Sequence, residues 1–262
     1  MKVLQQPLGP VQANCYLVME NHHAILIDPA DMYPNLEFIL KENECTLEAI
    51  ILTHAHFDHI SGVDKIVDAF HCDVYLNPNE FDFLQDPDLN SSFAFYMDVT
   101  CVAKCKPILE GKNTIAGFDI EAMYCPGHSI GSTVLKIKDC LFTGDVLFQG
   151  SIGRMDLATG SVSSMKQSLK KLVQLDKDYK VYPGHGPSTS LSQEKKMERK
   201  FKICRNLIRI SAFFSYMRRG DKKWMIYYKI SLRMRLKKRQ AIFILLCRIK
   251  NFRLNFERKM IC

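Results

Sequence analysis

The chain has 262 residues, of which 47% are hydrophobic and 24% are charged. This composition is typical of a globular protein and excludes a disordered or collagen-like chain. No apolar run approaches the roughly 18 to 20 residues that span a bilayer, and residues 1–12 lack the apolar segment of a secretory signal, so we expect a cytoplasmic protein. The ten cysteines form no CxxC pair, and we interpret them as reduced thiols.

The net charge of +8 is unevenly distributed along the chain. Residues 1–194 contain 14 Lys and Arg against 25 Asp and Glu, whereas residues 195–262 contain 22 against 3. The basic segment also has a single glycine and no proline. We therefore predict a domain over residues 1–197 and a strongly basic C-terminal extension over 198–262.

Four interpretations of this extension remain open. Its basic and aromatic residues can bind nucleic acid, lie on an anionic membrane surface, or form a lid over a substrate. The segment can also be a frameshift or read-through product, beginning near Met197, that was never selected to fold. Its lack of proline and its few acidic residues and glycines are the reason for this interpretation. Its apolar run at 241–247 is too short to span a membrane.

Short apolar runs alternate with segments of helical periodicity over residues 1–197, which predicts an α/β fold. The predicted strands are 14–19, 23–27, 48–52, 74–76, 118–123, 133–137, 140–142 and 180–182. Helices are predicted over 60–70 and 163–175. In the second helix Ser163 is the expected N-cap, and one buried apolar stripe consists of Met165, Leu169, Leu172 and Val173.

Four of the predicted strands lead directly into polar side chains that can bind metal. The strongest motif, residues 53–59 (THAHFDH), places three imidazoles and one carboxylate within six residues. These ligand types suit zinc, iron or manganese. The candidate ligands are His54, His56, Asp58, His59, His128, Asp145 and His185. His22, His23 and His71 lie outside such motifs, and we interpret them as ordinary surface or packing residues.

The order and spacing of these motifs resemble the metallo-β-lactamase superfamily. The motifs are HxHxDH at 54–59, CPGH at 125–128, FTGD at 142–145 and YPGHG at 182–186. Residues 14–17, 27–30 and 148–154 further resemble the glyoxalase II-like (hydroxyacylglutathione hydrolase-like) enzymes of the short form, which lacks the C-terminal helical domain. The resemblance covers about residues 1–197.

This resemblance implies an αββα sandwich of two mixed β-sheets with outer helices and two divalent metal ions at one edge, zinc being expected first and iron or manganese as alternatives. His54, His56 and His128 would hold one ion, Asp58, His59 and His185 the other, and Asp145 would bridge them. Asp28 matches a family aspartate that supports the ligands.

The implied reaction is hydrolysis of a small acyl thioester, such as S-lactoylglutathione, by a metal-bridging hydroxide. Asp58 is the expected catalytic residue because it would bind metal and orient that hydroxide, while the thiol leaves as thiolate without an acid. A zinc β-lactamase fits less well, because such enzymes typically lack a histidine at the position of His59 or use a cysteine ligand in the second site. The alternatives are a mononuclear iron persulfide dioxygenase, a quorum-signal lactonase, and a nucleic-acid or membrane adaptor that uses the basic extension.

Three further residues have two interpretations each. Arg154 can bind a substrate carboxylate or pair with Asp156 to fix a loop. Tyr16 can line the cleft or pack in the core. Cys125, next to the CPGH histidine, can be a nucleophile or a buried thiol, and we favour the buried thiol because the metal centre already supplies a nucleophile.

Overall fold

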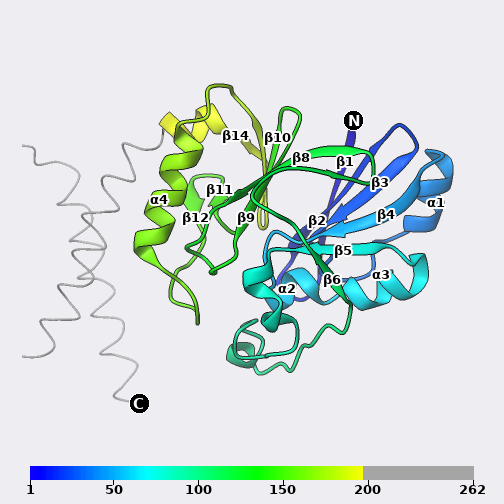
Figure 1. Ribbon diagram of the computed structural model, residues 1–262, viewed down its shortest axis with the longest axis horizontal. Coiled ribbons are helices and arrows are strands. Elements are labelled where there is room, and N and C mark those ends of the chain that lie inside the picture. The colour runs from blue at the N-terminus through cyan, green and yellow to red at the C-terminus, as the bar shows by residue number, and fades with distance from the viewer. Residues whose placement is uncertain (197–262) are drawn as a thin grey trace, which may run out of the picture. The chain divides into compact units, whose positions relative to one another are not determined.

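The computed structural model describes residues 1–196 and contains two mixed six-stranded sheets (Figure 1). The strands of the first sheet follow one another in chain order, antiparallel from β1 to β3 and parallel from β3 to β6. They are β1 (Lys2–Leu8), β2 (Ala13–Glu20), β3 (His23–Ile27), β4 (Thr46–Ile51), β5 (Asp73–Leu76) and β6 (Cys105–Pro107).

The second sheet has the strand order β14-β13-β10-β9-β8-β7, in which only the pair β10 and β13 is parallel. Its strands are β7 (Gly111–Ile115), β8 (Phe118–Tyr124), β9 (Thr133–Ile137), β10 (Cys140–Gly144), β13 (Lys180–Pro183) and β14 (Thr189–Ser190). A small hairpin of β11 (Leu147–Phe148) and β12 (Ser151–Ile152) follows β10.

The two sheets pack face to face because their strands are apolar on both sides. In β3, Ile25 and Ile27 belong to the layer between the sheets, where Leu135 and Phe142 of the second sheet also lie. The alternate residues of β3 face the outer layer of helices instead. This period of two places successive side chains on opposite faces of the sheet.

Helices cover the outer face of each sheet, which completes an αββα sandwich (Figure 1). The first sheet is covered by α1 (Leu36–Glu42) and α3 (Val63–Phe70), and the second by α4 (Val162–Val173). The predicted fold class is therefore confirmed.

Three details of the predicted helices are wrong. The helix expected over 60–70 is divided into α2 (Phe57–Ile60) and α3, with Gly62 between them. The N-cap of α4 is Ser161, whose hydroxyl accepts a hydrogen bond from the Ser164 N–H, rather than Ser163. Val173, expected in the buried stripe of α4, is 37% exposed, whereas Ser168 is buried and donates a hydrogen bond to the Pro126 carbonyl.

Short 3-10 helices connect β5 to β6, namely η1 (Pro78–Glu80), η2 (Asp82–Leu84) and η3 (Phe93–Phe95). Within residues 1–196 no helix is both long and apolar enough to cross a membrane. The predicted basic extension over 198–262 lies outside the described residues, so the four interpretations of it stay predictions.

Candidate metal centre

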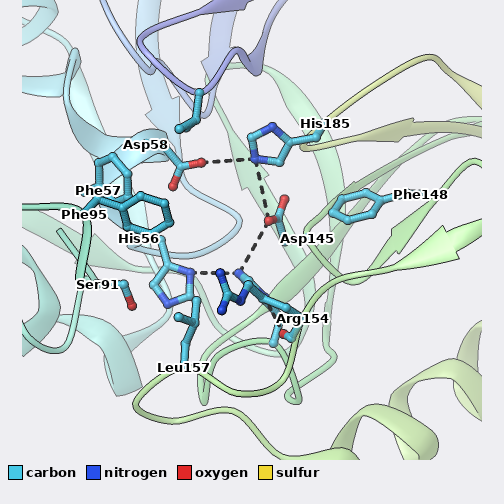
Figure 2. Close-up of a pocket in the computed structure, with 12 residues that line it drawn as sticks. His56, Phe57, Asp58, Ser91, Phe95, Asp145, Phe148, Arg154, Leu157 and His185 are labelled. Atoms are coloured by element: carbon cyan, nitrogen blue, oxygen red, sulfur yellow. Dashed lines mark hydrogen bonds and ion pairs between the residues drawn. The ribbon is translucent and has the colours of Figure 1, made fainter. Parts of the chain in front are cut away.

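All seven predicted ligands converge at one edge of the sandwich, although they come from four separate places in the sequence. Figure 2 shows those that line the cavity, among them His56, Asp58, Asp145 and His185. Each group follows the end of a strand or lies in the short helix α2, so the rigid sheets position the loops that carry it. His54 and His56 follow β4, Asp58 and His59 lie in α2, His128 follows β8, Asp145 follows β10, and His185 follows β13.

The first group of side chains consists of His54, His56 and His128, whose ligand atoms lie within 4.8 Å of one another. Nδ1 of His56 lies 2.8 Å from Nε2 of His128. All three rings are almost completely buried. Three converging imidazole nitrogens are a set of ligands that zinc accepts.

The second group consists of Asp58, His59 and His185, again with ligand atoms within 4.8 Å. Oδ2 of Asp58 lies 3.1 Å from Nε2 of His185 and 3.7 Å from Nε2 of His59. His59 is fully buried, whereas 29% of the His185 side chain is exposed. The second group therefore borders solvent through His185.

Asp145 lies between the two groups (Figure 2). Its Oδ2 is 3.5 Å from Nε2 of His128 and 3.7 Å from Nε2 of His185, and its Oδ1 is 3.5 Å from Nε2 of His59. One carboxylate thus faces both sets of histidines, which is the arrangement expected of a bridging ligand.

The residues present fit bound metal ions. Nε2 of His54, Nε2 of His59 and Oδ1 of Asp145 are buried atoms without a hydrogen-bond partner among the described residues. A buried polar atom without a partner is costly. Cations bound at this point would give all three atoms the partner they lack.

The charges of the histidines differ within the cluster. Burial lowers the pKa of His54 well below its usual value, and burial with the neighbouring His128 lowers the pKa of His56 to about 3. Burial also lowers the pKa of His59, but the carboxylates of Asp58 and Asp28 outweigh burial and raise it well above the usual value. The imidazoles of His54 and His56 are therefore uncharged, which is the form of imidazole that binds metal.

The two carboxylates of the cluster are ionised at neutral pH. Burial raises their pKa values, but neighbouring histidines outweigh burial, His59 foremost, and leave the pKa of both Asp58 and Asp145 below the usual range. An ionised carboxylate is the form that binds a divalent cation.

Asp28 contacts both Thr53, which precedes His54, and the ring of His59. Its carboxylate accepts hydrogen bonds from the N–H of Thr53, at 2.8 Å, and from the Thr53 hydroxyl, at 2.6 Å. The same group lies 3.0 Å from Nδ1 of His59. A hydrogen-bonded carboxylate next to a metal-binding imidazole fixes the ring and its tautomer. These contacts of Asp28 agree with the supporting role that the resemblance implied.

Residues of β2 hold the turn that carries His185. The Asn14 side chain donates hydrogen bonds to the carbonyls of Pro183 and Gly186, both at 2.9 Å. The Tyr16 hydroxyl donates to the Pro183 carbonyl at 2.6 Å, and its ring packs against Phe142 and Tyr182. Tyr16 is 2% exposed, so of its two interpretations the structure supports packing.

A cavity of about 340 Å³ opens over the cluster (Figure 2). Besides five of the predicted ligands it is lined by the side chains of Val11, Phe57, Ser91, Phe95, Phe148, Arg154 and Leu157. The Arg154 guanidinium forms two hydrogen bonds with the Asp156 carboxylate, at 2.7 and 2.8 Å, and the Arg154 carbonyl lies 2.8 Å from Nδ1 of His128. Arg154 therefore has the loop-fixing contacts of its second interpretation.

The remaining candidates lie away from the cluster or are buried. Cys125 is fully buried, and burial raises the pKa of its thiol to about 12, so it is neutral and inert. His23 contacts Glu48, His22 contacts the Glu44 carbonyl, and His71 ends α3.

Two residues that shape the site, Asn14 and Glu80, were not predicted from the sequence as site residues. Asn14 belongs to the motif at 14–17 that carries the resemblance, but its contacts were not predicted. Nothing in the local sequence distinguished Glu80, whose hydrogen bonds go to residues 25 to 51 positions away.

The family model of the metallo-beta-lactamase superfamily matches residues 8–185. The probable metallo-hydrolase YqgX of Bacillus subtilis is 38% identical over 200 residues, which cover 74% of this chain and 94% of the relative. The chain thus spans nearly the whole of that relative.

Solved structures are also similar to this chain in fold and sequence. The crystal structure of the BLEG-1 B3 metallo-beta-lactamase is 39% identical, with a TM-score of 0.70 and coverage of 75% of this chain and 97% of that chain. The crystal structure of TTHA1623 in a di-iron-bound form is 36% identical, with a TM-score of 0.66 and coverage of 73% and 96%. The family match, the shared fold and the histidine-rich cluster together show that the chain belongs to the metallo-beta-lactamase superfamily and is a metal-dependent hydrolase.

Proposed function

We propose that the protein hydrolyses small acyl thioesters, with S-lactoylglutathione as the reference substrate, at a centre of two divalent metal ions. His54, His56 and His128 hold one ion in this proposal. Asp58, His59 and His185 hold the other, and Asp145 bridges the two. The converging ligand atoms, and the buried atoms that lack hydrogen-bond partners, support this assignment.

When bound, two such ions supply a nucleophile by lowering the pKa of water to about 7, and they polarise the carbonyl under attack. Asp58 is proposed to orient the attacking water, because its carboxylate borders the cavity and is itself held 3.1 Å from His185. Zinc is the first candidate on ligand chemistry, and the di-iron form of TTHA1623 makes iron the second.

The observation that carries the thioester proposal is the composition of the cavity wall. Apart from the proposed ligands, the described residues of the wall include no side chain that releases a proton near neutral pH. The described wall thus offers no dedicated general acid besides the proposed ligands, which favours a leaving group that departs as its anion. A thiol, with an ordinary pKa of about 8.5, leaves as thiolate, whereas an alcohol or amine needs a proton.

The wall also favours an acyl group with apolar surface. Phe57 and Phe95 lie with ring centroids 5.1 Å apart, and Val11, Phe148 and Leu157 complete an apolar rim. The cation of this rim, Arg154, is already paired with Asp156. Contacts of this kind bind alkyl and acyl chains rather than carboxylates.

Hydrolysis of a thioester panel by the full, metal-reconstituted chain tests the proposal. S-D-lactoylglutathione and short acyl thioesters should be cleaved, and His54→Ala should abolish cleavage together with metal binding. A wild-type chain that binds metal and cleaves none of these thioesters contradicts the proposal. Oxygen uptake with a persulfide and one iron per chain would instead support the dioxygenase alternative.

A second candidate is hydrolysis of β-lactams, which the 39% identity to the BLEG-1 B3 metallo-beta-lactamase favours. The same cavity wall argues against it, because a β-lactam releases an amine that needs a proton. Hydrolysis of a chromogenic cephalosporin, compared with thioester hydrolysis on the same preparation, separates the two. A larger kcat/KM for the cephalosporin would make β-lactams the preferred substrates.

A further inference from the structure

Glu80 is a buried acidic residue that belongs to none of the ligand groups. It ends η1, directly after β5, and its side chain has no exposed surface. Burial raises its pKa, although three hydrogen-bond donors act in the opposite direction. A carboxyl group is seldom fully buried unless its oxygens have partners, so the contacts of Glu80 indicate what it does.

The carboxyl oxygens of Glu80 bind two different loops. Oε2 accepts a hydrogen bond from the N–H of Ala55 at 2.5 Å, and Ala55 lies between His54 and His56. Oε1 accepts hydrogen bonds from the N–H of Gly131, at 2.7 Å, and from the hydroxyl of Ser129, which follows His128. One side chain is thus bonded to the immediate neighbours of all three histidines of the first group.

The loop at Gly131 packs tightly against the Glu80 side chain. A Cβ atom at Gly131 would lie 2.6 Å from Cγ of Glu80, so the loop approaches the glutamate as closely as glycine allows. Asn77, at the start of η1, donates a hydrogen bond to the Gly131 carbonyl at 2.9 Å. The turn after β5 therefore binds the loop after β8 at two points.

The two loops belong to different sheets, since β4 and β8 lie in separate sheets of the sandwich. The distance between His56 and His128 therefore depends on the packing of the two sheets and on the direct contacts between the two loops. Among the described residues, Glu80 joins them through hydrogen bonds to both.

We propose that Glu80 is a positioning residue that sets the spacing of His54, His56 and His128 before metal binds. This inference rests on the metal centre of the proposed function but does not depend on the substrate. Without the carboxylate the two loops lose their common acceptor, so metal binding has to order more of the site, which lowers the affinity for the metal.

The test compares Glu80→Gln with the wild type in the full chain, using Zn²⁺ affinity from chelator competition and the absorption spectrum of the Co²⁺-loaded protein. Glutamine keeps the shape but turns an N–H donor toward a backbone N–H, so one loop is released. We expect metal affinity to fall by about 10- to 100-fold, which is typical when a residue that supports a ligand is lost. The Co²⁺ spectrum should change because the ligand geometry changes.

Glu194→Gln is the matched control. Glu194 is also buried, and it accepts hydrogen bonds from a backbone N–H, that of Gly150, and from a hydroxyl, that of Thr189. Neither partner adjoins a proposed ligand. This variant should lose stability as Glu80→Gln does while keeping wild-type Zn²⁺ affinity and a wild-type Co²⁺ spectrum.

If Glu80→Gln does not fold, Ser129→Ala removes one of the three hydrogen bonds and should lower Zn²⁺ affinity in the same direction by a smaller factor. Wild-type affinity and spectrum in Glu80→Gln, or in Ser129→Ala where only that variant folds, overturn the positioning role. A wild-type chain that binds Zn²⁺ but cleaves no thioester refutes the proposed function alone. A wild-type chain that binds no metal overturns both.

Discussion

Nδ1 of His56 and Nε2 of His128 lie 2.8 Å apart, although the two residues are 72 positions apart in the sequence and follow strands of different sheets. Burial and the neighbouring His128 lower the pKa of His56 to about 3, so the His56 imidazole is uncharged at neutral pH. The close approach of two ring nitrogens from separate sheets makes the metal centre a link across the sandwich. Binding of metal should therefore affect stability as well as catalysis.

We expect removal of metal to lower the free energy of unfolding. A cation that binds only the folded chain stabilises it by about 2.7 kcal/mol when its concentration is 100 times its Kd. Thermal unfolding of the chelator-treated protein, with and without added Zn²⁺, measures this difference. In His54→Ala the added Zn²⁺ should stabilise far less, and an equal gain in both proteins would place the metal elsewhere.

The convergence of all seven candidate ligands could be predicted from the sequence, because each lies in a short motif that follows an apolar strand. The short apolar runs of β3, β4 and β10, which alternate with segments of helical periodicity, likewise predicted an α/β fold. These signals are local, and local patterns are what a single sequence displays.

Contacts between distant segments could not be predicted in the same way. The helix expected over 60–70 is divided at Gly62, where a Cβ atom would lie 2.6 Å from the backbone of Asp31 and where the N–H bonds to the Pro29 carbonyl. The role of Glu80 depends on Ala55 and Gly131, which only the folded chain brings near it. Periodicity contains no information about such neighbours.

Gly184→Ala should damage the second ligand group. A Cβ atom at this position would lie 2.2 Å from Oδ1 of Asp145 and 2.9 Å from Cε1 of His59, so the Asp145 carboxylate must move. We expect at least a tenfold loss of both metal affinity and kcat/KM, since small displacements at a metal site have large effects. The control is Gly186→Asn. Nothing lies within 4 Å of a Cβ atom at Gly186, and asparagine tolerates the φ of +76° at this position. Equal losses of metal affinity and kcat/KM in the two variants would contradict the steric argument.

Cys125→Ala should retain thioester hydrolysis within a few-fold of the wild type. The thiol is buried, and its pKa of about 12 keeps it protonated and unreactive at every pH at which the enzyme would be assayed. Steady-state kinetics of the variant and the rate of thiol alkylation in the folded wild type both check this. Loss of activity with metal content unchanged would restore the nucleophile interpretation.

Arg154→Gln should lower kcat/KM by less than tenfold. Its side chain is 54% exposed and paired with Asp156, and exposed ion pairs contribute at most about 1 kcal/mol. The contact to His128 is made by the Arg154 carbonyl, which the substitution keeps. A hundredfold loss that is confined to substrates with a carboxylate would show that the arginine leaves Asp156 and binds substrate.

Phe95→Ala should weaken hydrolysis of thioesters with long apolar acyl groups more than hydrolysis of the acetyl thioester. Phe95 lies in the apolar rim against Phe57, so truncation removes surface that the acyl chain would cover. We expect kcat/KM for a hexanoyl thioester to fall about tenfold, which corresponds to the ~1.4 kcal/mol of a partly buried contact. Phe93→Ala is the matched control, because Phe93 lies in the same 3-10 helix, is 66% exposed and does not line the cavity. Equal losses for the acetyl and hexanoyl thioesters in Phe95→Ala, or the same profile in Phe93→Ala, would show that the rim does not select the acyl group.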